Sequence, residues 1–236
     1  MRIIGVEVAG GVPVFTGALP HGADPHRLAW ELGYRIVRPL SATGGAPDLT
    51  LTVQVGRHGR SSELQPPRTR SIDPDLDLAA EAEPVVRQRL AAYGIVLSER
   101  GLLATQFSDR TAVPGLWGLP GGGIDPGESP AQALVREVTE ESGQELEISH
   151  LLDVQTDHWI GRSPARVVED FHAVRIIYAA TCRAPSEPVV YDRGGTTAAA
   201  AWVPLDHWAR MAWSSGARTL LDRHLRELTR SGRLAR

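Results

Sequence analysis

The sequence predicts an α/β protein of the α+β type, in which a mixed β-sheet lies between helices and a small α+β unit precedes it. Three observations predict this class. Short runs of alternating apolar residues are separated by glycine-rich turns, which is typical of strands. Two segments, 129–143 and 215–230, have helical apolar spacing. A composition of 42% hydrophobic and 22% charged residues is that of a globular chain able to bury a sizeable core.

The first part of the chain, residues 1–56, is predicted to form the small α+β unit. "RIIGVEV" and "PVFTGAL" are expected strands, and "YRIVRPL" and "LTLTVQV" are two more. Between the two pairs, Asp24 as N-cap and Pro25 at the first helical position predict a short helix. Residues 57–83 are polar and contain prolines, which predicts a linker or an exposed loop.

Residues 84–236 are predicted to form a second, larger domain. "VRQRLAAYGIVLSE" and "LLATQFS" are expected to pair as a hairpin, and "RVVEDFHAVRIIYAATC" and "AAAAWVPL" are expected strands. Apolar residues at 217, 220, 221 and 225 predict the C-terminal helix. The intervening "TDHWIGRSPARVVED" is interpreted as a long loop near the mouth of a substrate site.

The composition excludes several classes of function. All 25 basic residues are arginine, so neither a lysine nucleophile nor a lysine-containing phosphate-binding loop can exist. A net charge of -3 makes nucleic acid an unexpected partner. Cys182 is the single cysteine and is expected to be a buried strand residue, which excludes an intramolecular disulfide. With neither a signal peptide nor a long apolar run, a cytoplasmic protein without a membrane partner is expected.

The central helix is the most informative element. Ser129 is a predicted N-cap that forms a capping box with Gln132, and Gly143 is the predicted C-terminal stop. The apolar stripe expected to pack on the sheet consists of Ala131, Leu134, Val135 and Val138.

Three glutamates on this helix, Glu137, Glu140 and Glu141, are spaced i, i+3 and i+4. That spacing brings three carboxylates to one side of the helix, where they repel each other. A hard divalent cation such as Mg²⁺ would make the arrangement favourable, because it binds carboxylates and bridges to phosphates. The preceding glycine loop can bring the backbone carbonyl of Gly121 close to the same ion. Arg136 can pair with Glu140 at i, i+4.

The segment 122–144 resembles the Nudix box, G-x5-E-x7-R-E-U-x-E-E-x-G-U, where U is aliphatic. The matching residues are Gly122, Glu128, Arg136, Glu137, Val138, Glu140, Glu141 and Gly143. Gln144 departs from the final aliphatic position, which should affect packing at the helix end more than metal chemistry.

The resemblance implies a Mg²⁺-dependent hydrolase, with Mn²⁺ as a substitute, that cleaves the diphosphate bond of a nucleoside diphosphate derivative. Such substrates include a sugar nucleotide such as ADP-ribose, a dinucleoside polyphosphate or a modified nucleoside triphosphate. The implied metal ligands are Gly121, Glu137, Glu140 and Glu141. Arg136 and Glu128 are counted with the catalytic residues: the resemblance implies a structural role for Arg136 and assistance to a metal for Glu128. The alternative is a nucleotide-sensing module that binds without turnover.

Several assignments stay open at this point. Glu137 is the first choice for the base that activates water, but Glu169, Asp170 or Asp192 could take this role. Candidate substrate-binding residues are Trp117, Trp159, Arg162, Arg166 and Glu169. No HxxxH or HExxH arrangement occurs, so no zinc site is expected. The extra N-terminal unit favours a homodimer.

Overall fold

A computed structural model describes residues 1–59, 70–77, 83–163, 166–191 and 194–230. Three α-helices, one short 3-10 helix and twelve strands lie in these ranges. No helix among the described residues is both long enough and apolar enough to cross a membrane. The predicted α+β class is confirmed.

The chain divides into two compact units, each of which contains segments that are distant in sequence. Unit 1 consists of residues 1–91, 123–130 and 151–176. Unit 2 consists of residues 92–122, 131–150 and 177–236. Three long strands, β6, β10 and β11, contribute residues to both units.

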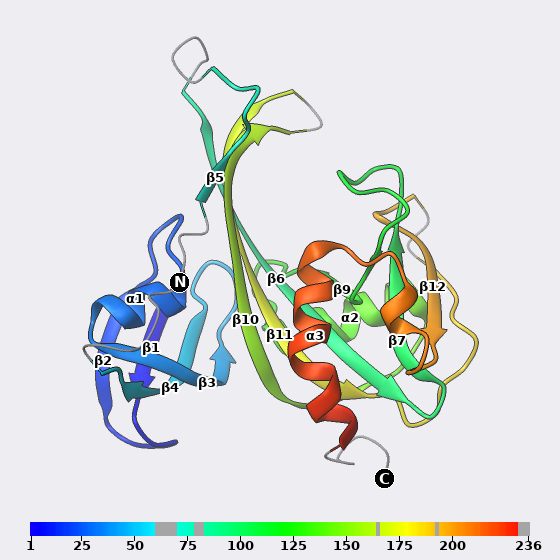
Figure 1. Cartoon of the computed structure of the whole chain (residues 1–236), viewed down its shortest axis with the longest axis horizontal. Coiled ribbons are helices and arrows are strands. Elements are labelled where there is room, and N and C mark those ends of the chain that lie inside the picture. Colours follow the sequence, from blue (N-terminus) through cyan, green and yellow to red (C-terminus); the bar gives the residue numbers. More distant parts are fainter. Residues whose placement is uncertain (60–69, 78–82, 164–165, 192–193, 231–236) are drawn as a thin grey trace. The chain divides into compact units, whose positions relative to one another are not determined.

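Unit 1 contains a four-stranded mixed sheet at the N-terminal end of the chain (Figure 1). Its strands, in the spatial order β2-β1-β4-β3, are β2 (Pro13–Ala18), β1 (Arg2–Val6), β4 (Thr50–Arg57) and β3 (Tyr34–Thr43). The two central strands, β1 and β4, are parallel, and the outer strands pair antiparallel to them.

Alternation explains why the central strands are buried on one face. Leu51, Val53 and Val55 of β4 are buried, while the residues between them are partly exposed. Helix α1 (Pro25–Glu31) begins as expected, because the Asp24 carboxylate accepts a hydrogen bond from the backbone N–H of Arg27 at 2.9 Å. The four strands and the helix predicted in residues 1–56 are therefore all present.

A second, eight-stranded sheet has the spatial order β12-β7-β6-β11-β10-β5, with β8 paired to β7 and β9 paired to β6. Its strands are β5 (Arg70–Ile72), β6 (Val85–Ser98), β7 (Gly101–Phe107), β8 (Trp117–Gly118), β9 (Gly121–Gly123), β10 (Glu147–Arg162), β11 (Val168–Thr181) and β12 (Thr197–Val203). The predicted hairpin of β6 and β7 is confirmed, since Ser98 and Gly101 pair at its turn.

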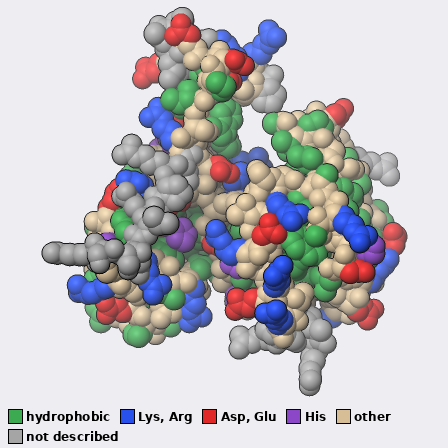
Figure 2. Space-filling view, viewed as in Figure 1, with side chains coloured by type: hydrophobic (Ala, Val, Ile, Leu, Met, Phe, Trp, Pro, Cys, Tyr) green, Lys and Arg blue, Asp and Glu red, His purple; other side chains and the backbone are tan. Residues whose placement is uncertain are grey.

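Unit 2 carries the helices α2 (Pro130–Ser142), of which all but the first residue belongs to it, and α3 (Ser215–Arg230), together with the 3-10 helix η1 (Trp208–Arg210). In the view of Figure 1, α3 lies in front of the strands of this unit and α2 lies behind them. The buried side of α3 is a leucine-rich stripe at the predicted positions, including Leu221 and Leu225. Arginine and acidic side chains intermingle on its outer side in Figure 2.

Three sequence-based expectations are wrong. The segment interpreted as a long loop is mostly strand, because β10 continues to Arg162 and β11 starts at Val168. Its periodicity is hidden because polar Thr156 and His158 occupy buried positions of the alternation. Within the predicted linker, residues 70–72 form β5, which pairs parallel to β10 and is too short to give a pattern.

The third error concerns the apolar stripe of α2. Val135 is 43% exposed, and Ala133 is buried in its place. The buried side of the helix therefore lies over Ala133, Leu134 and Val138, turned slightly from the predicted stripe.

Candidate active site

Helix α2 holds the acidic residues on a firmly packed element. Leu134 and Val138 are fully buried, and a Cβ on Gly94 of β6 would lie within 3.2 Å of the Leu134 side chain. The helix ends at Gly143, whose φ is +69° and whose N–H donates to the carbonyl of Thr139 at 2.9 Å. The predicted stop is therefore confirmed, and the acidic face is fixed on a rigid support.

Glu141 is the most deeply buried of the three glutamates, with 6% of its surface exposed. The backbone N–H of Gly121 donates to its Oε2 at 2.9 Å. The hydroxyl of Thr197, the first residue of β12, donates to its Oε1. Both carboxylate oxygens therefore have a hydrogen-bond donor from a different segment, which fixes the orientation of this side chain.

Glu137 lies directly against the glycine loop. A Cβ on Gly122 would come within 2.5 Å of the Glu137 carboxylate, so only glycine permits this approach. The Glu137 side chain is 18% exposed, and the guanidinium of Arg136 donates to its Oε1 at 3.0 Å.

Arg136 also contacts Glu140, at 3.2 Å, as the i, i+4 spacing predicts. One guanidinium thus bridges two carboxylates of the cluster. The Glu140 side chain is 46% exposed, so solvent weakens its ion pair with the arginine.

Gly121 takes a backbone conformation that other residues rarely adopt. Its φ is +134°, and a Cβ there would lie 2.2 Å from the carbonyl oxygen of Ala92. The loop is held close to β6, because the N–H of Gly94 donates to the carbonyl of Pro120 at 3.0 Å. The glycine requirement noted in the sequence therefore has a definite steric cause.

The donor set fits a hard divalent cation better than a transition metal. Glu137, Glu140 and Glu141 offer carboxylate oxygens only, and the loop packed against Glu137 consists of glycines. The cluster is looser than a formed metal cage. Among the described residues, the one group of three ligand atoms within 4.8 Å of one another lies elsewhere, at His21, His158 and Asp170.

Gln144, the residue that departs from the Nudix pattern, is buried after the end of α2. Its amide donates to the carbonyl of Ser142 at 3.1 Å and to the hydroxyl of Ser186 at 3.0 Å, and its carbonyl accepts from the N–H of Ser186 at 2.9 Å. A polar contact to residue 186 thus replaces the expected aliphatic packing at the helix end.

Other predicted residues fall on both units. In unit 2, Trp117 forms part of β8 and is partly buried; its backbone N–H donates to the carbonyl of Ala212. Cys182 follows β11 directly, and burial raises the pKa of its thiol, in agreement with an unreactive residue. In unit 1, Glu128 accepts a hydrogen bond from the N–H of Asp125 at 3.1 Å.

The remaining candidate substrate-binding residues belong to unit 1. Trp159 packs against Phe171 with ring centroids 5.5 Å apart. Glu169 is buried and pairs with Arg87 at 2.8 Å. Arg162 is the last residue of β10 and Arg166 lies in the connection to β11; both are exposed. Roles for these four residues stay predictions.

The alternative bases have different surroundings. Asp170 accepts hydrogen bonds from His21 and His158, and Glu169 is engaged by Arg87. Asp192 lies outside the described residues. Thr197 could not be predicted as a partner of Glu141, because a hydroxyl at the start of a strand is common.

Comparison with known proteins found a matching family model and several relatives. A family model described as "NUDIX domain" matches residues 87–223, more than half of the chain. The chain is 45% identical over 65 residues to "Nucleoside triphosphatase NudI" of Enterobacter sp. (strain 638), which is 27% of this chain and 46% of that protein. It is 36% identical over 83 residues to the protein of that name from Klebsiella pneumoniae (strain 342), covering 35% and 55%. The chain thus spans about half the length of the curated relatives it matches.

Solved structures of similar proteins were also found. A MutT NUDIX hydrolase from Burkholderia pseudomallei matches with a TM-score of 0.46 and 27% identity, over 58% of this chain and 98% of that one. The NUDIX domain of NrtR from Shewanella oneidensis, solved with ADP ribose, matches with a TM-score of 0.46 and 20% identity, over 65% and 94%.

Proposed function

The chain belongs to the Nudix family, and we propose that it is a hydrolase that cleaves a phosphoanhydride bond in a nucleotide derivative. The observation that carries the proposal is the buried carboxylate of Glu141, held by the N–H of Gly121 and the hydroxyl of Thr197 beside two further glutamates. A carboxylate fixed by two donors at the edge of an acidic cluster is suited to a preorganised site.

A divalent cation is proposed as the cofactor, with Mg²⁺ as the first choice and Mn²⁺ as a substitute. Glu137, Glu140, Glu141 and the backbone carbonyl of Gly121 would hold it. When bound, it would neutralise phosphate oxygens and favour deprotonation of a nearby water.

The three glutamates are proposed to have different tasks. Glu141 is the fixed anchor, because both of its oxygens already accept hydrogen bonds. Glu137 is proposed to take the proton from the attacking water, since its carboxylate lies against the loop backbone at Gly122. Arg136 bridges Glu137 and Glu140, and we propose that it positions both.

A nucleotide panel with and without Mg²⁺ tests this function. Nucleoside triphosphates come first, because the curated relatives are named nucleoside triphosphatases, followed by ADP-ribose and dinucleoside polyphosphates. The expected result is a nucleoside monophosphate product that disappears in EDTA. Binding of a nucleotide without turnover of any compound would favour the alternative of a sensing module.

The organisation of the whole protein also remains a proposal. We propose that residues 1–56 form an additional unit before a Nudix domain at 84–236, with 57–83 between them, and that the protein is a cytoplasmic homodimer. Light scattering of the full chain measures its mass in solution. A monomeric mass at all concentrations would contradict the proposed dimer.

A further inference from the structure

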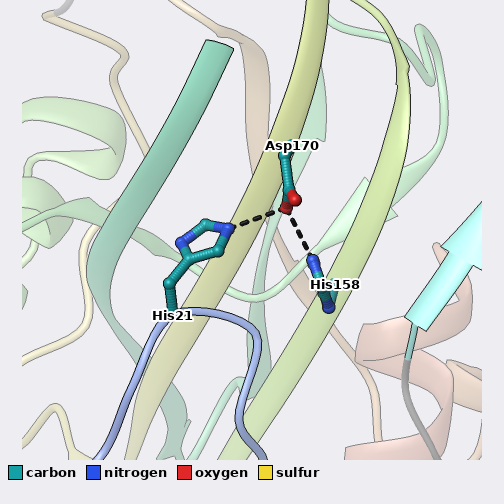
Figure 3. Close-up of side chains that lie close together, drawn as sticks. All are labelled: His21, His158 and Asp170. Carbon is teal, nitrogen blue, oxygen red and sulfur yellow. Dashed lines mark hydrogen bonds and ion pairs between the residues drawn. The ribbon is translucent and has the colours of Figure 1, made fainter. Parts of the chain in front are cut away.

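Three residues of unit 1 that are distant in sequence meet at one point. His21 lies in the loop between β2 and α1, His158 lies on β10, and Asp170 lies on β11. The Nε2 atoms of His21 and His158 are 2.7 Å and 2.6 Å from the same Oδ1 of Asp170. Figure 3 shows both imidazole rings pointing at this carboxylate from different segments.

The backbone at Gly22 allows the loop between β2 and α1 to pack against His158 of β10. Gly22 has a φ of +74°, and a Cβ there would come within 2.6 Å of the His158 ring. Only glycine therefore lets the residue after His21 lie against this imidazole. His158 is buried, while His21 and Asp170 are partly exposed, so the cluster is accessible from one side.

A cavity of about 410 Å³ opens next to the cluster within unit 1. His21 and His158 both line it, together with residues of the loop and of α1, and Arg70 of β5. The two imidazole side chains therefore border a cavity large enough for a small solute. The cavity also leaves room for water or another ligand beside them.

We propose that His21, His158 and Asp170 form a binding site for one zinc ion or a related divalent transition metal. Two imidazole nitrogens and one carboxylate oxygen are a donor set for such ions, whereas Mg²⁺ prefers oxygen ligands alone. The three ligand atoms lie within 4.8 Å of one another. This site shares no residue with the acidic cluster of α2.

Without a metal ion, hydrogen bonds to Asp170 hold the three side chains together. Each imidazole Nε2 lies at hydrogen-bond distance from the same oxygen of Asp170, so an N–H at either position can donate a hydrogen bond to it, and a metal ion would replace such protons on binding. With zinc–ligand bonds of about 2.0–2.1 Å, each imidazole nitrogen must move away from the Asp170 oxygen by less than about 1 Å. The His21 side chain can make this adjustment, because it lies on a loop and is 26% exposed.

The experiment is zinc titration of the full-length chain after removal of metals by a chelator. It uses calorimetry and, in parallel, the visible absorption of Co²⁺ as a probe of nitrogen ligands. The E137Q/E141Q double variant serves as the background, since it weakens the acidic cluster on α2. One equivalent of zinc is expected to bind in this background.

Paired substitutions at His21 separate metal binding from hydrogen bonding. His21→Gln keeps a hydrogen-bond donor but is a poor zinc ligand, so zinc affinity should fall about ten-fold or more. His21→Cys supplies a thiolate ligand and should retain zinc. Asp170→Asn should weaken binding like His21→Gln. His207→Gln is the matched control, because it removes an exposed histidine that contacts Asp206 at 2.8 Å.

Two outcomes would overturn the proposal. One is equal zinc affinity in the E137Q/E141Q background with and without His21→Gln or Asp170→Asn. The other is a wild-type protein that shows a normal fold by circular dichroism but no Co²⁺ absorption. The three residues would then form a hydrogen-bonded cluster and no metal site.

Discussion

The hydroxyl of Thr197 donates a hydrogen bond to the buried carboxylate of Glu141. The two residues are far apart in the chain, at the start of β12 and near the end of α2. The contact ties the acidic helix to a strand of the same unit. It occupies the Glu141 oxygen that the N–H of Gly121 does not reach.

Thr197→Val should therefore damage both stability and turnover. The change keeps the shape of the side chain but removes a hydrogen-bond donor from a buried carboxylate, which costs about 1–3 kcal/mol. Thermal unfolding and the rate of nucleotide hydrolysis measure the two effects. Thr139→Val is the control on α2, because the Thr139 hydroxyl donates only to the helix carbonyl of Val135. Equal behaviour of the two variants would contradict the role of Thr197.

Gly122→Ala should displace Glu137. The added methyl group would lie 2.5 Å from the carboxylate, so either the loop or the glutamate must move. We expect hydrolysis to fall by about ten-fold or more, because a misplaced catalytic group loses its alignment, while the protein remains folded. Gly17→Ala is the matched control, since a Cβ there would meet no atom within 4 Å. Normal kinetics of Gly122→Ala would show that this close approach is unimportant.

Gln144→Leu restores the residue type of the Nudix pattern, yet it should destabilise this protein. The variant removes the hydrogen bonds of the buried Gln144 amide to the N–H of Ser186 at 2.9 Å and to the carbonyl of Ser142 at 3.1 Å. Each lost hydrogen bond costs about 0.5–1.5 kcal/mol. Denaturant unfolding measures the change. A gain in stability would mean that aliphatic packing outweighs the polar contacts of Gln144.

His172 on β11 predicts a loss of stability in acid. The ring is fully buried, and the Gln88 side-chain nitrogen lies 3.0 Å from its Nδ1. Burial, followed by the nearby imidazoles of His21 and His158, lowers the pKa of His172 from 6.5 to about 4. The groups that oppose this shift are the carbonyl of Ala23 and the carboxylate of Asp24.

The sign follows from proton binding. Between pH 6.5 and about 4 the unfolded chain protonates this histidine and the folded protein does not, so acid favours unfolding. The full difference corresponds to roughly 3 kcal/mol. His172→Gln should flatten the fall in melting temperature over this pH range, and His26→Gln, on α1, should not. An unchanged slope in His172→Gln would contradict the assignment.

Asp170 affects the pH dependence of folding stability at lower pH than His172 does. Burial opposes the shift, but hydrogen bonds from His21 and His158 together lower the pKa of this carboxyl group. Its contribution to stability is therefore present above the pKa of an unfolded aspartate. It is lost as the pH falls through the lowered value.

The parts of the molecule that the sequence could predict are those encoded locally. The end of α2 at Gly143 and the spacing of Glu137, Glu140 and Glu141 depend on residues within a few turns of one helix. The strands of residues 1–56 can be predicted for the same reason, since apolar alternation and turns are short-range signals.

The contacts that were missed join segments that are far apart. The sequence pattern predicts a loop at His158, because a buried polar side chain breaks the apolar alternation of a strand. Its cluster partners, His21 and Asp170, come from other segments of the chain. The hydroxyl of Thr197 gives no local signal of its bond to Glu141. Such partners are defined by tertiary packing rather than by spacing.

The most direct test of the central claim is Mg²⁺-dependent turnover in single glutamate variants. Release of nucleoside monophosphate is measured for the wild type, Glu137→Gln, Glu140→Gln and Glu141→Gln, with Glu145→Gln, an exposed neighbour of the helix end, as control. The account predicts that Glu137→Gln and Glu141→Gln lose most activity with circular dichroism unchanged, while Glu145→Gln matches the wild type. Wild-type turnover in both Glu137→Gln and Glu141→Gln would contradict it.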